Sequence, residues 1–207
     1  MVDSMESVHL EVILGPLFSG KTSDLIRRIQ RYHLACYRCV IIKHSNVDQI
    51  CSTTSVKSHD GHSLPAILAP NLHDVKDAIK DFDVIGIDEG HLFPDLVSFC
   101  QEQSDNGKKV IVAALDSCGE TVFKNALQLI PLSESVTKLT AICMSCANEA
   151  TFSKAVPGDK EVFGSQPKLM SVCGDCYLKT NHSWRSPFQK YLSKDSNSPL
   201  VSGSCNS

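Results

Sequence analysis

The chain has 207 residues, of which 42% are hydrophobic and 21% charged, and its net charge is -3 at pH 7. These values are typical of one well-packed soluble domain with room for a small additional unit, and they exclude a strongly basic nucleic-acid-binding protein. No apolar run is long enough to cross a bilayer. The first twenty residues carry acidic side chains but no Lys or Arg, which argues against a secretory signal and against a transit peptide. We therefore expect a cytoplasmic protein, whose ten cysteines indicate a metal site and free thiols rather than disulfides.

Short β-prone runs alternate with helical segments in the first part of the chain. Residues 21–34 place apolar side chains at helical spacing with arginines on the other face, and residues 94–103 begin with Pro94 and continue as an amphipathic segment. The apolar runs lie at 8–14, 39–43, 83–87 and 109–115. Because strands and helices alternate to about Ile130, the sequence predicts an α/β fold with a parallel sheet covered by helices on both faces.

The stretch "GPLFSGKT" follows the first predicted strand and precedes the first predicted helix. Its spacing, Gly15-x4-Gly20-Lys21-Thr22, is that of a P-loop, although a chance glycine-rich turn is the alternative. Loop N–H groups would face the phosphates of ATP, Lys21 would neutralise the β and γ oxygens, and the Thr22 hydroxyl would ligate Mg²⁺. The candidate ATP- and Mg²⁺-binding residues are Gly15, Ser19, Gly20, Lys21, Thr22 and Asp88.

The stretch "DVIGIDEG" is an apolar strand that ends in two carboxylates, Asp88 and Glu89. An acid at the carboxyl end of a strand beside a P-loop strand commonly helps to hold Mg²⁺, which is the role we expect for Asp88. Glu89 could accept a proton from an attacking hydroxyl or water. The alternative is a solvated acidic strand end.

The sequence pattern changes after Lys138, where two Cys-x2-Cys pairs appear. Their spacing allows four thiolates to surround one structural Zn²⁺, and the predicted ligands are Cys143, Cys146, Cys173 and Cys176. A further pair, Cys36 and Cys39, has no partner pair nearby, so we interpret it as two packing thiols. We predict a P-loop α/β domain over 8–138, a small zinc-ribbon-like subdomain over 139–180 and a disordered, serine-rich tail over 181–207.

Several motifs occur in one order along the chain: "GPLFSGKT", "KSHDGHSLPA", "VIGIDEGHLFPD", "VIVAALD", "PLSESVTKLTAICMSC" and "SVCGDCYLK". Together, from about Val12 to Lys179, they resemble the zinc-containing (type II) thymidine kinase family. The resemblance implies transfer of the γ-phosphate of ATP to the 5′-hydroxyl of a deoxynucleoside, thymidine by default, by a homotetramer with Mg²⁺ and structural Zn²⁺. It also implies that Glu89 is the catalytic base, that the four cysteines above are the zinc ligands, and that residues 155–172 form a lasso over the base. The nucleoside-binding candidates are Leu17, Asp48, Leu92, Leu115, Ser153, Phe163 and Leu169.

This chain departs from the family pattern around the base. Leu92, Gly119 and Leu169 stand where the family carries aromatic residues, and the lasso is shorter by about two residues. Loss of rings removes stacking faces and volume. We therefore state the hypothesis that the pocket accepts a purine deoxynucleoside, deoxyguanosine first, because its amide edge presents the same donor–acceptor pattern as thymine.

Two family arginines near the phosphates are also replaced, by Ile50 and Ala155. Their loss would lower the rate unless Lys154 or Arg27 compensates. This keeps open a catalytically eroded regulatory protein on the same fold, whereas a P-loop ATPase acting on nucleic acid is disfavoured by the net charge. ATP consumption that depends on added nucleoside would separate the kinase from both alternatives.

Overall fold

The computed structural model describes residues 9–45, 55–57, 63–155 and 169–179, and the structural statements below concern these residues. Its centre is a six-stranded sheet in the order β10-β1-β7-β6-β2-β5, in which every neighbouring pair is parallel. The strands are β1 (Leu10–Leu14), β2 (Cys39–His44), β5 (Ile67–Ala69), β6 (Val84–Asp88), β7 (Lys109–Ala114) and β10 (Ser135–Lys138). The predicted α/β fold with a parallel sheet is confirmed.

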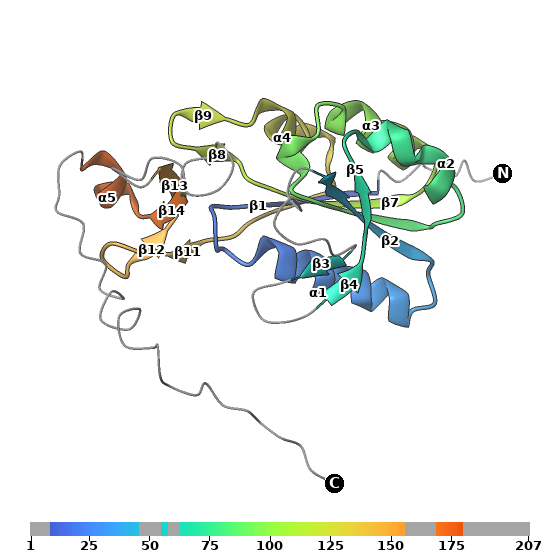
Figure 1. Cartoon of the computed structure of the whole chain (residues 1–207), viewed down its shortest axis with the longest axis horizontal. Helices are drawn as coiled ribbons and strands as arrows, with labels where there is room; N and C mark the ends of the chain where they lie inside the picture. The colour runs from blue at the N-terminus through green and yellow to red at the C-terminus, as the bar shows by residue number, and fades with distance from the viewer. Residues whose placement is uncertain (1–8, 46–54, 58–62, 156–168, 180–207) are drawn as a thin grey trace, which may run out of the picture.

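Helices cover both faces of this sheet (Figure 1). On one face, α1 (Lys21–Leu34) buries Leu25, Ile26 and Ile29 against alternate residues of the strands, as its helical spacing predicted. The opposite face is covered by η2 (Leu72–Val75), α2 (Lys76–Ile79), α3 (Leu96–Asp105), α4 (Lys124–Gln128) and η4 (Ile130–Leu132), with η3 (Gly90–Leu92) between β6 and α3. Because the central strands are buried on both sides, they are apolar at almost every position, as expected for parallel strands.

Helix α3 begins at Leu96, two residues after the predicted start at Pro94. The residue before a proline favours an extended backbone, and Phe93 has φ -86 and ψ 119. The carboxylate of Asp95 then accepts hydrogen bonds from the N–H groups of Leu72 and His73, at 3.2 and 2.9 Å, instead of capping its own helix.

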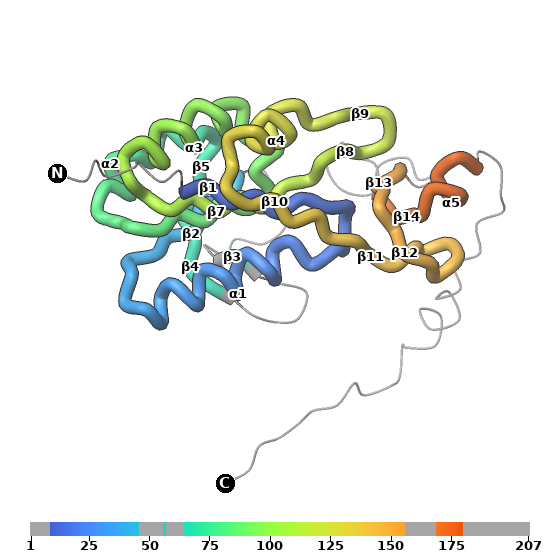
Figure 2. The backbone as a smooth tube through the Cα atoms, turned by 180° about the vertical axis from the view of Figure 1, so that it is seen from behind, coloured from blue at the N-terminus to red at the C-terminus, as the bar shows by residue number. Residues whose placement is uncertain are grey.

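The four-cysteine unit, by which we mean residues 139–155 and 169–179, lies beyond the carboxyl ends of β1 and β10 (Figure 2). It consists of two antiparallel pairs and one short helix: β11 (Ala141–Ile142) with β12 (Glu149–Ala150), β13 (Phe152–Ala155) with β14 (Leu169–Val172), and α5 (Gly174–Leu178). The remaining antiparallel pairs are β3 (Ser55–Lys57) with β4 (Ser63–Pro65) and β8 (Ser117–Cys118) with β9 (Thr121–Val122). Nowhere in the described ranges is a helix both long and apolar enough to span a membrane.

Candidate active site

The loop between β1 and α1, residues 15–20, is called the glycine loop here, and its two glycines are required by its shape. A Cβ on Gly15 would come within 2.7 Å of both the Leu139 carbonyl oxygen and the Ser19 Oγ, so no larger residue fits. Gly20 has φ +83, in the left-handed region that favours glycine, and it is the N-cap residue of α1. The predicted strand–loop–helix context is therefore present, with the N-terminus of α1 directly behind the loop.

Lys21, the first residue of α1, is buried, and its Nζ donates a hydrogen bond of 2.7 Å to the Pro16 carbonyl oxygen. Burial lowers the pKa of Lys21, while the carboxylates of Glu89, Asp88 and Asp116 oppose that shift. The ammonium group is thus folded back onto the glycine loop and surrounded by acids, as expected for a cation that can move onto an anionic ligand.

Thr22 and Asp88 meet where β6 ends. The Thr22 hydroxyl donates a hydrogen bond of 2.9 Å to Asp88 Oδ1. Burial raises the pKa of Asp88, and the Thr22 hydrogen bond and the cation of Lys43 partly offset this. Mg²⁺ prefers oxygen ligands, which coordinate it directly or through bound water. The adjacent hydroxyl and buried carboxylate therefore fit the ion predicted from the sequence.

Glu89 follows β6 in a conformation that is uncommon for a residue with a side chain. Its φ of 53 and ψ of 40 lie in the left-handed region. Burial and the neighbouring Asp88 raise the pKa of Glu89 to about 7, with Lys21 and Lys43 opposing the shift. The strained turn places the Glu89 carboxyl near Lys21, Lys43 and Asp88. Its pKa suits a residue that accepts a proton near neutral pH.

His91 lies beside Glu89 and was not singled out from the sequence. Its ring is 5% exposed, its Nδ1 is 3.6 Å from Glu89 Oε2, and the same Nδ1 accepts a hydrogen bond of 3.3 Å from the Leu115 N–H. Burial and the cation of Lys21 lower the pKa of His91 to about 4. Because Nδ1 is an acceptor, the neutral ring carries its proton on Nε2. This contact also places Leu115, a predicted nucleoside-binding residue, next to the Glu89 turn.

Two further charged residues at the carboxyl edge of the sheet were missed. Lys43 is paired in register with Asp88 across β2 and β6, and it lowers the pKa of both Asp88 and Glu89. Asp116 follows β7, is buried, and forms an ion pair of 2.7 Å with the Nζ of Lys138 at the end of β10. Asp116 could have been found by the signal that revealed Asp88, an acidic residue at the carboxyl end of a buried strand.

The nucleoside-binding candidates are placed unevenly. Leu17 and Ser153 are in contact, because the Leu17 N–H donates a hydrogen bond of 2.9 Å to Ser153 Oγ. Leu92 ends η3 and is half-buried, and Leu169 begins β14 opposite Ala155. Asp48, Phe163 and Ile50, most of the predicted lasso and the predicted tail lie outside the described residues.

Gly119 lies in the turn between β8 and β9, with φ +58 and no atom within 4 Å of a Cβ built on it. Its N–H donates to the Ser153 carbonyl oxygen and its own carbonyl accepts from the Tyr177 hydroxyl, both at 2.8 Å. There is therefore open space at Gly119, and its backbone joins the β8–β9 turn to the four-cysteine unit.

The four predicted zinc ligands converge. The sulfur atoms of Cys143, Cys146, Cys173 and Cys176 all lie within 4.8 Å of one another. Sulfurs placed tetrahedrally at about 2.3 Å from Zn²⁺ would be about 3.8 Å apart, so the cluster fits the ion with little adjustment. Burial raises the pKa of Cys143, but hydrogen bonds from nearby backbone N–H groups outweigh it and lower that pKa to about 7. The pKa values of Cys146 and Cys176 are raised instead, because burial and hydrogen bonds among the thiols outweigh the hydrogen bonds that lower them. Cys36 and Cys39 do not belong to this cluster.

Neither cation suggested as a substitute for the missing arginines faces the glycine loop. The Nζ of Lys154 donates to the carbonyl oxygens of Tyr177 and Lys179, at 2.7 and 3.0 Å. Arg27 Nε donates to Asp24 Oδ1 at 3.1 Å.

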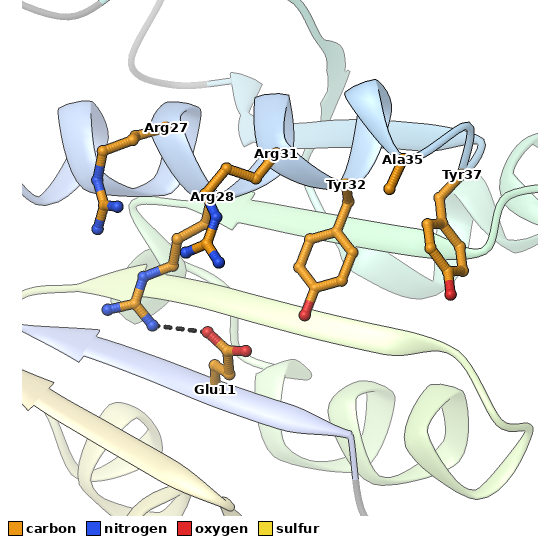
Figure 3. Close-up of a pocket in the computed structure, with 7 residues that line it drawn as sticks. All are labelled: Glu11, Arg27, Arg28, Arg31, Tyr32, Ala35 and Tyr37. Carbon is orange, nitrogen blue, oxygen red and sulfur yellow. Dashed lines mark hydrogen bonds and ion pairs between the residues drawn. The ribbon is translucent and has the colours of Figure 1, made fainter.

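A cavity of about 420 Å³ lies along α1 (Figure 3). It is lined by Glu11, Arg27, Arg28, Arg31, Tyr32, Ala35 and Tyr37. None of these lining residues belongs to the predicted site, and Arg28 is itself paired with Glu11.

Comparison with known proteins decides the family. The sequence pattern described as "Thymidine kinase" matches residues 8–177. The chain belongs to the thymidine kinase family. It is therefore a nucleoside kinase, an enzyme that transfers a phosphate group to a nucleoside.

Three relatives show how close this membership is. The chain is 49% identical to the thymidine kinase of variola virus over 177 residues, which is 84% of this chain and 99% of the relative. It is 48% identical over the same shares to the thymidine kinases of vaccinia virus (strain Western Reserve) and monkeypox virus. Among solved structures, domain III of the Thermotoga maritima replication initiation protein DnaA matches at 15% identity and a TM-score of 0.39, covering 66% of this chain and 56% of that one, which is too distant to support a conclusion.

Proposed function

We propose that this member of the family transfers the γ-phosphate of ATP to the 5′-hydroxyl of thymidine. The observation that carries the proposal is the convergence of four residues: Lys21 and Thr22 at the N-terminus of α1, and Asp88 and Glu89 at the carboxyl end of β6. Phosphoryl transfer depends on positioning and on neutralisation of charge, and this arrangement offers a glycine loop for the phosphates, a lysine and a carboxylate base.

Each residue has a defined task in the proposed reaction. Lys21 leaves the Pro16 carbonyl oxygen and binds the β- and γ-phosphate oxygens. Thr22 and Asp88 would hold Mg²⁺, which would supply further neutralisation of the phosphate charge. Glu89 accepts the proton of the 5′-hydroxyl as that oxygen bonds to the γ-phosphorus and the bond to the β–γ bridging oxygen breaks. The products are thymidine monophosphate and ADP.

Lys43 supplies a second cation to this reaction. Residues paired across adjacent parallel strands project from the same face of a sheet, so Lys43 projects on the same face as Asp88, which Thr22 of α1 contacts. Its cation acts on both carboxylates. Since Lys154 and Arg27 are engaged elsewhere, Lys43 is the better candidate to take over charge neutralisation near the γ-phosphate.

Thymidine is proposed as the acceptor because the relatives described above are thymidine kinases and share almost half of their residues with this chain. The comparisons give no support to the purine hypothesis or to the eroded regulatory protein. Gly119 is an open position that we expect to lie near the base, and a substrate assay can judge directly whether it alters the choice of nucleoside.

The deciding experiment measures phosphorylation of thymidine, deoxyuridine, deoxycytidine, deoxyguanosine and deoxyadenosine with ATP and Mg²⁺. Thymidine is expected to have the highest kcat/KM. A preparation of the Glu89→Gln variant, purified in the same way, controls for contaminating kinases. Deoxyguanosine as the best substrate would instead favour the enlarged pocket, and ATP turnover that no nucleoside stimulates would favour the regulatory protein.

The thiol cluster and the family resemblance support a structural Zn²⁺. The family resemblance alone supports a homotetramer, and the composition of the sequence supports a cytoplasmic location. With four sulfur ligands the ion has no open position, so it would build structure and take no part in the reaction. Metal analysis of the purified protein tests the first proposal, and light scattering after size-exclusion chromatography tests the second.

A further inference from the structure

Two serines of the four-cysteine unit hold the backbone of the glycine loop. Ser153 Oγ accepts a hydrogen bond of 2.9 Å from the Leu17 N–H, and the Ser171 hydroxyl donates to the Leu17 carbonyl oxygen. The two serines are register partners across β13 and β14. Both polar groups of one residue in the loop are thus bonded by one cross-strand pair, which we call the serine pair.

The serine pair is almost inaccessible to solvent, with 1% of Ser153 and none of Ser171 exposed. A buried hydroxyl is costly unless it is hydrogen-bonded, so an apolar residue would be expected at these positions if packing alone mattered. Met170 and Val172, which flank Ser171 along β14, are apolar and pack in the four-cysteine unit. The hydroxyls therefore have a purpose outside the hairpin, and the bonded partner is Leu17.

The glycine loop has few hydrogen bonds of its own and contains a residue in a strained conformation. The Pro16 carbonyl oxygen accepts the Ser19 N–H at 3.4 Å and the Ser19 hydroxyl at 2.8 Å, while Phe18 is held at φ 59. Residues in such a conformation persist only when the surrounding structure imposes it. The residue that the serine pair holds, Leu17, lies directly before Phe18 and directly after Pro16, whose carbonyl oxygen accepts the hydrogen bond from Lys21.

We propose that Ser153 and Ser171 are positioning residues that make the geometry of the glycine loop depend on the folded four-cysteine unit. The connection is continuous: the Met144 N–H, beside the first thiol pair, donates a hydrogen bond of 2.9 Å to the Ser171 carbonyl oxygen, and Cys173 directly follows β14. A folded thiol cluster thereby fixes the position of Leu17 and of the phosphate-binding residues next to it. This inference rests on the proposed function only in taking the loop as the site of ATP.

The test replaces each serine by alanine in the full-length, metal-loaded protein. Ser104→Ala is the matched control, because Ser104 is also buried and its Oγ accepts a backbone N–H, that of His9, at 3.0 Å at the other end of β1. Ser153→Ala and Ser171→Ala should each lower kcat/KM for ATP by about 10-fold, the effect of leaving one buried backbone group unbonded. Their affinity for ADP should fall in calorimetry, and their thermal stability should drop no more than that of the control. Kinetic constants and ADP affinity equal to those of Ser104→Ala would overturn the inference.

A measurement on the wild-type protein needs no variant. The Leu17 amide should exchange its hydrogen as slowly as the amides of β13 and β14, and chelation of the metal should speed the exchange of all of them together. A Leu17 amide that stays protected after the four-cysteine unit has opened would overturn the inference. Exchange and ADP affinity do not depend on the nucleoside, so failure to phosphorylate thymidine would overturn the proposed function and leave the serine pair to be judged separately.

Discussion

The parallel sheet and the four-cysteine unit sit side by side but keep their shapes by different means. Both faces of the sheet are packed by large clusters of buried hydrophobic residues, with Phe93 and Phe99 wholly buried on one of them. The cluster in the four-cysteine unit has six buried residues, and two of these are Cys143 and Cys173. The sheet is therefore stabilised by apolar burial, whereas we expect the small unit to depend on its four thiols and on the ion proposed to bind them.

This difference matters because the candidate active site lies at the boundary. Lys21, Asp88 and Glu89 belong to the sheet and α1, while the hydroxyls that hold Leu17 belong to the four-cysteine unit. The residues proposed for the chemistry thus belong to the sheet and α1, which have a large hydrophobic core. The residues that align the glycine loop belong to the four-cysteine unit, which has a small one. Each prediction below changes one of these two parts.

The largest effect is expected from Cys143→Ser. A buried ligand lost from a four-sulfur site should release zinc, unfold β13 and β14, and reduce thymidine phosphorylation to background, while the sheet stays folded. Zinc content, far-ultraviolet circular dichroism and turnover measure these outcomes. Cys36→Ser, which changes an exposed thiol outside the cluster, should leave all three unchanged. Full activity in zinc-free Cys143→Ser protein would show that the two parts are independent.

The next effect concerns the chemistry of the sheet. Glu89→Gln keeps the size of the side chain but cannot accept a proton, so turnover should fall by about 10²-fold or more while ATP still binds. Zinc content and thermal stability should not change, in contrast to Cys143→Ser. Near-normal turnover in this variant would mean that another group takes the proton.

The sequence predicted the sheet part well because its signals are local. The bounds of α1 follow from helical spacing behind Gly20, and Asp88 and Glu89 are recognisable at the end of an apolar run. The four cysteines were recognisable by spacing alone. In contrast, the order of the strands, the pairing of Lys43 with Asp88 and the contact of Ser171 with Leu17 depend on register between distant segments. No local pattern encodes that register, so these residues could not be found before the fold was known.

A smaller effect is expected from Lys43→Met, which removes the proposed second cation and keeps the apolar stem. We expect kcat to fall by about 10-fold with a lesser change in KM for ATP, because the charge is needed most as the phosphate is transferred. Lys76→Met is the control, since Lys76 pairs with Glu102 on the surface of α2 and α3, away from the site. Equal kcat in wild-type and Lys43→Met protein would leave Lys21 as the sole cation needed from the described residues.

The smallest effect is expected from Asp83→Asn, which touches neither the active site nor the four-cysteine unit. Arg38 Nη2 donates to Asp83 Oδ1 at 2.8 Å where β2 and β6 begin. Hydrogen bonds from Arg38 lower the pKa of Asp83 from 3.8 to about 2. Because the folded pKa lies below the unfolded value, the pair stabilises the folded protein fully above the unfolded pKa and loses this contribution as pH falls through the folded one. The pair is exposed, so solvent screening keeps the contribution small. Urea unfolding should show wild type slightly more stable than Asp83→Asn near neutral pH, with the gap closing at about pH 2. Turnover should be unchanged. A gap that persists in acid would show that the ion pair is not its cause, and a loss of turnover would show that the amino ends of the strands also influence the site.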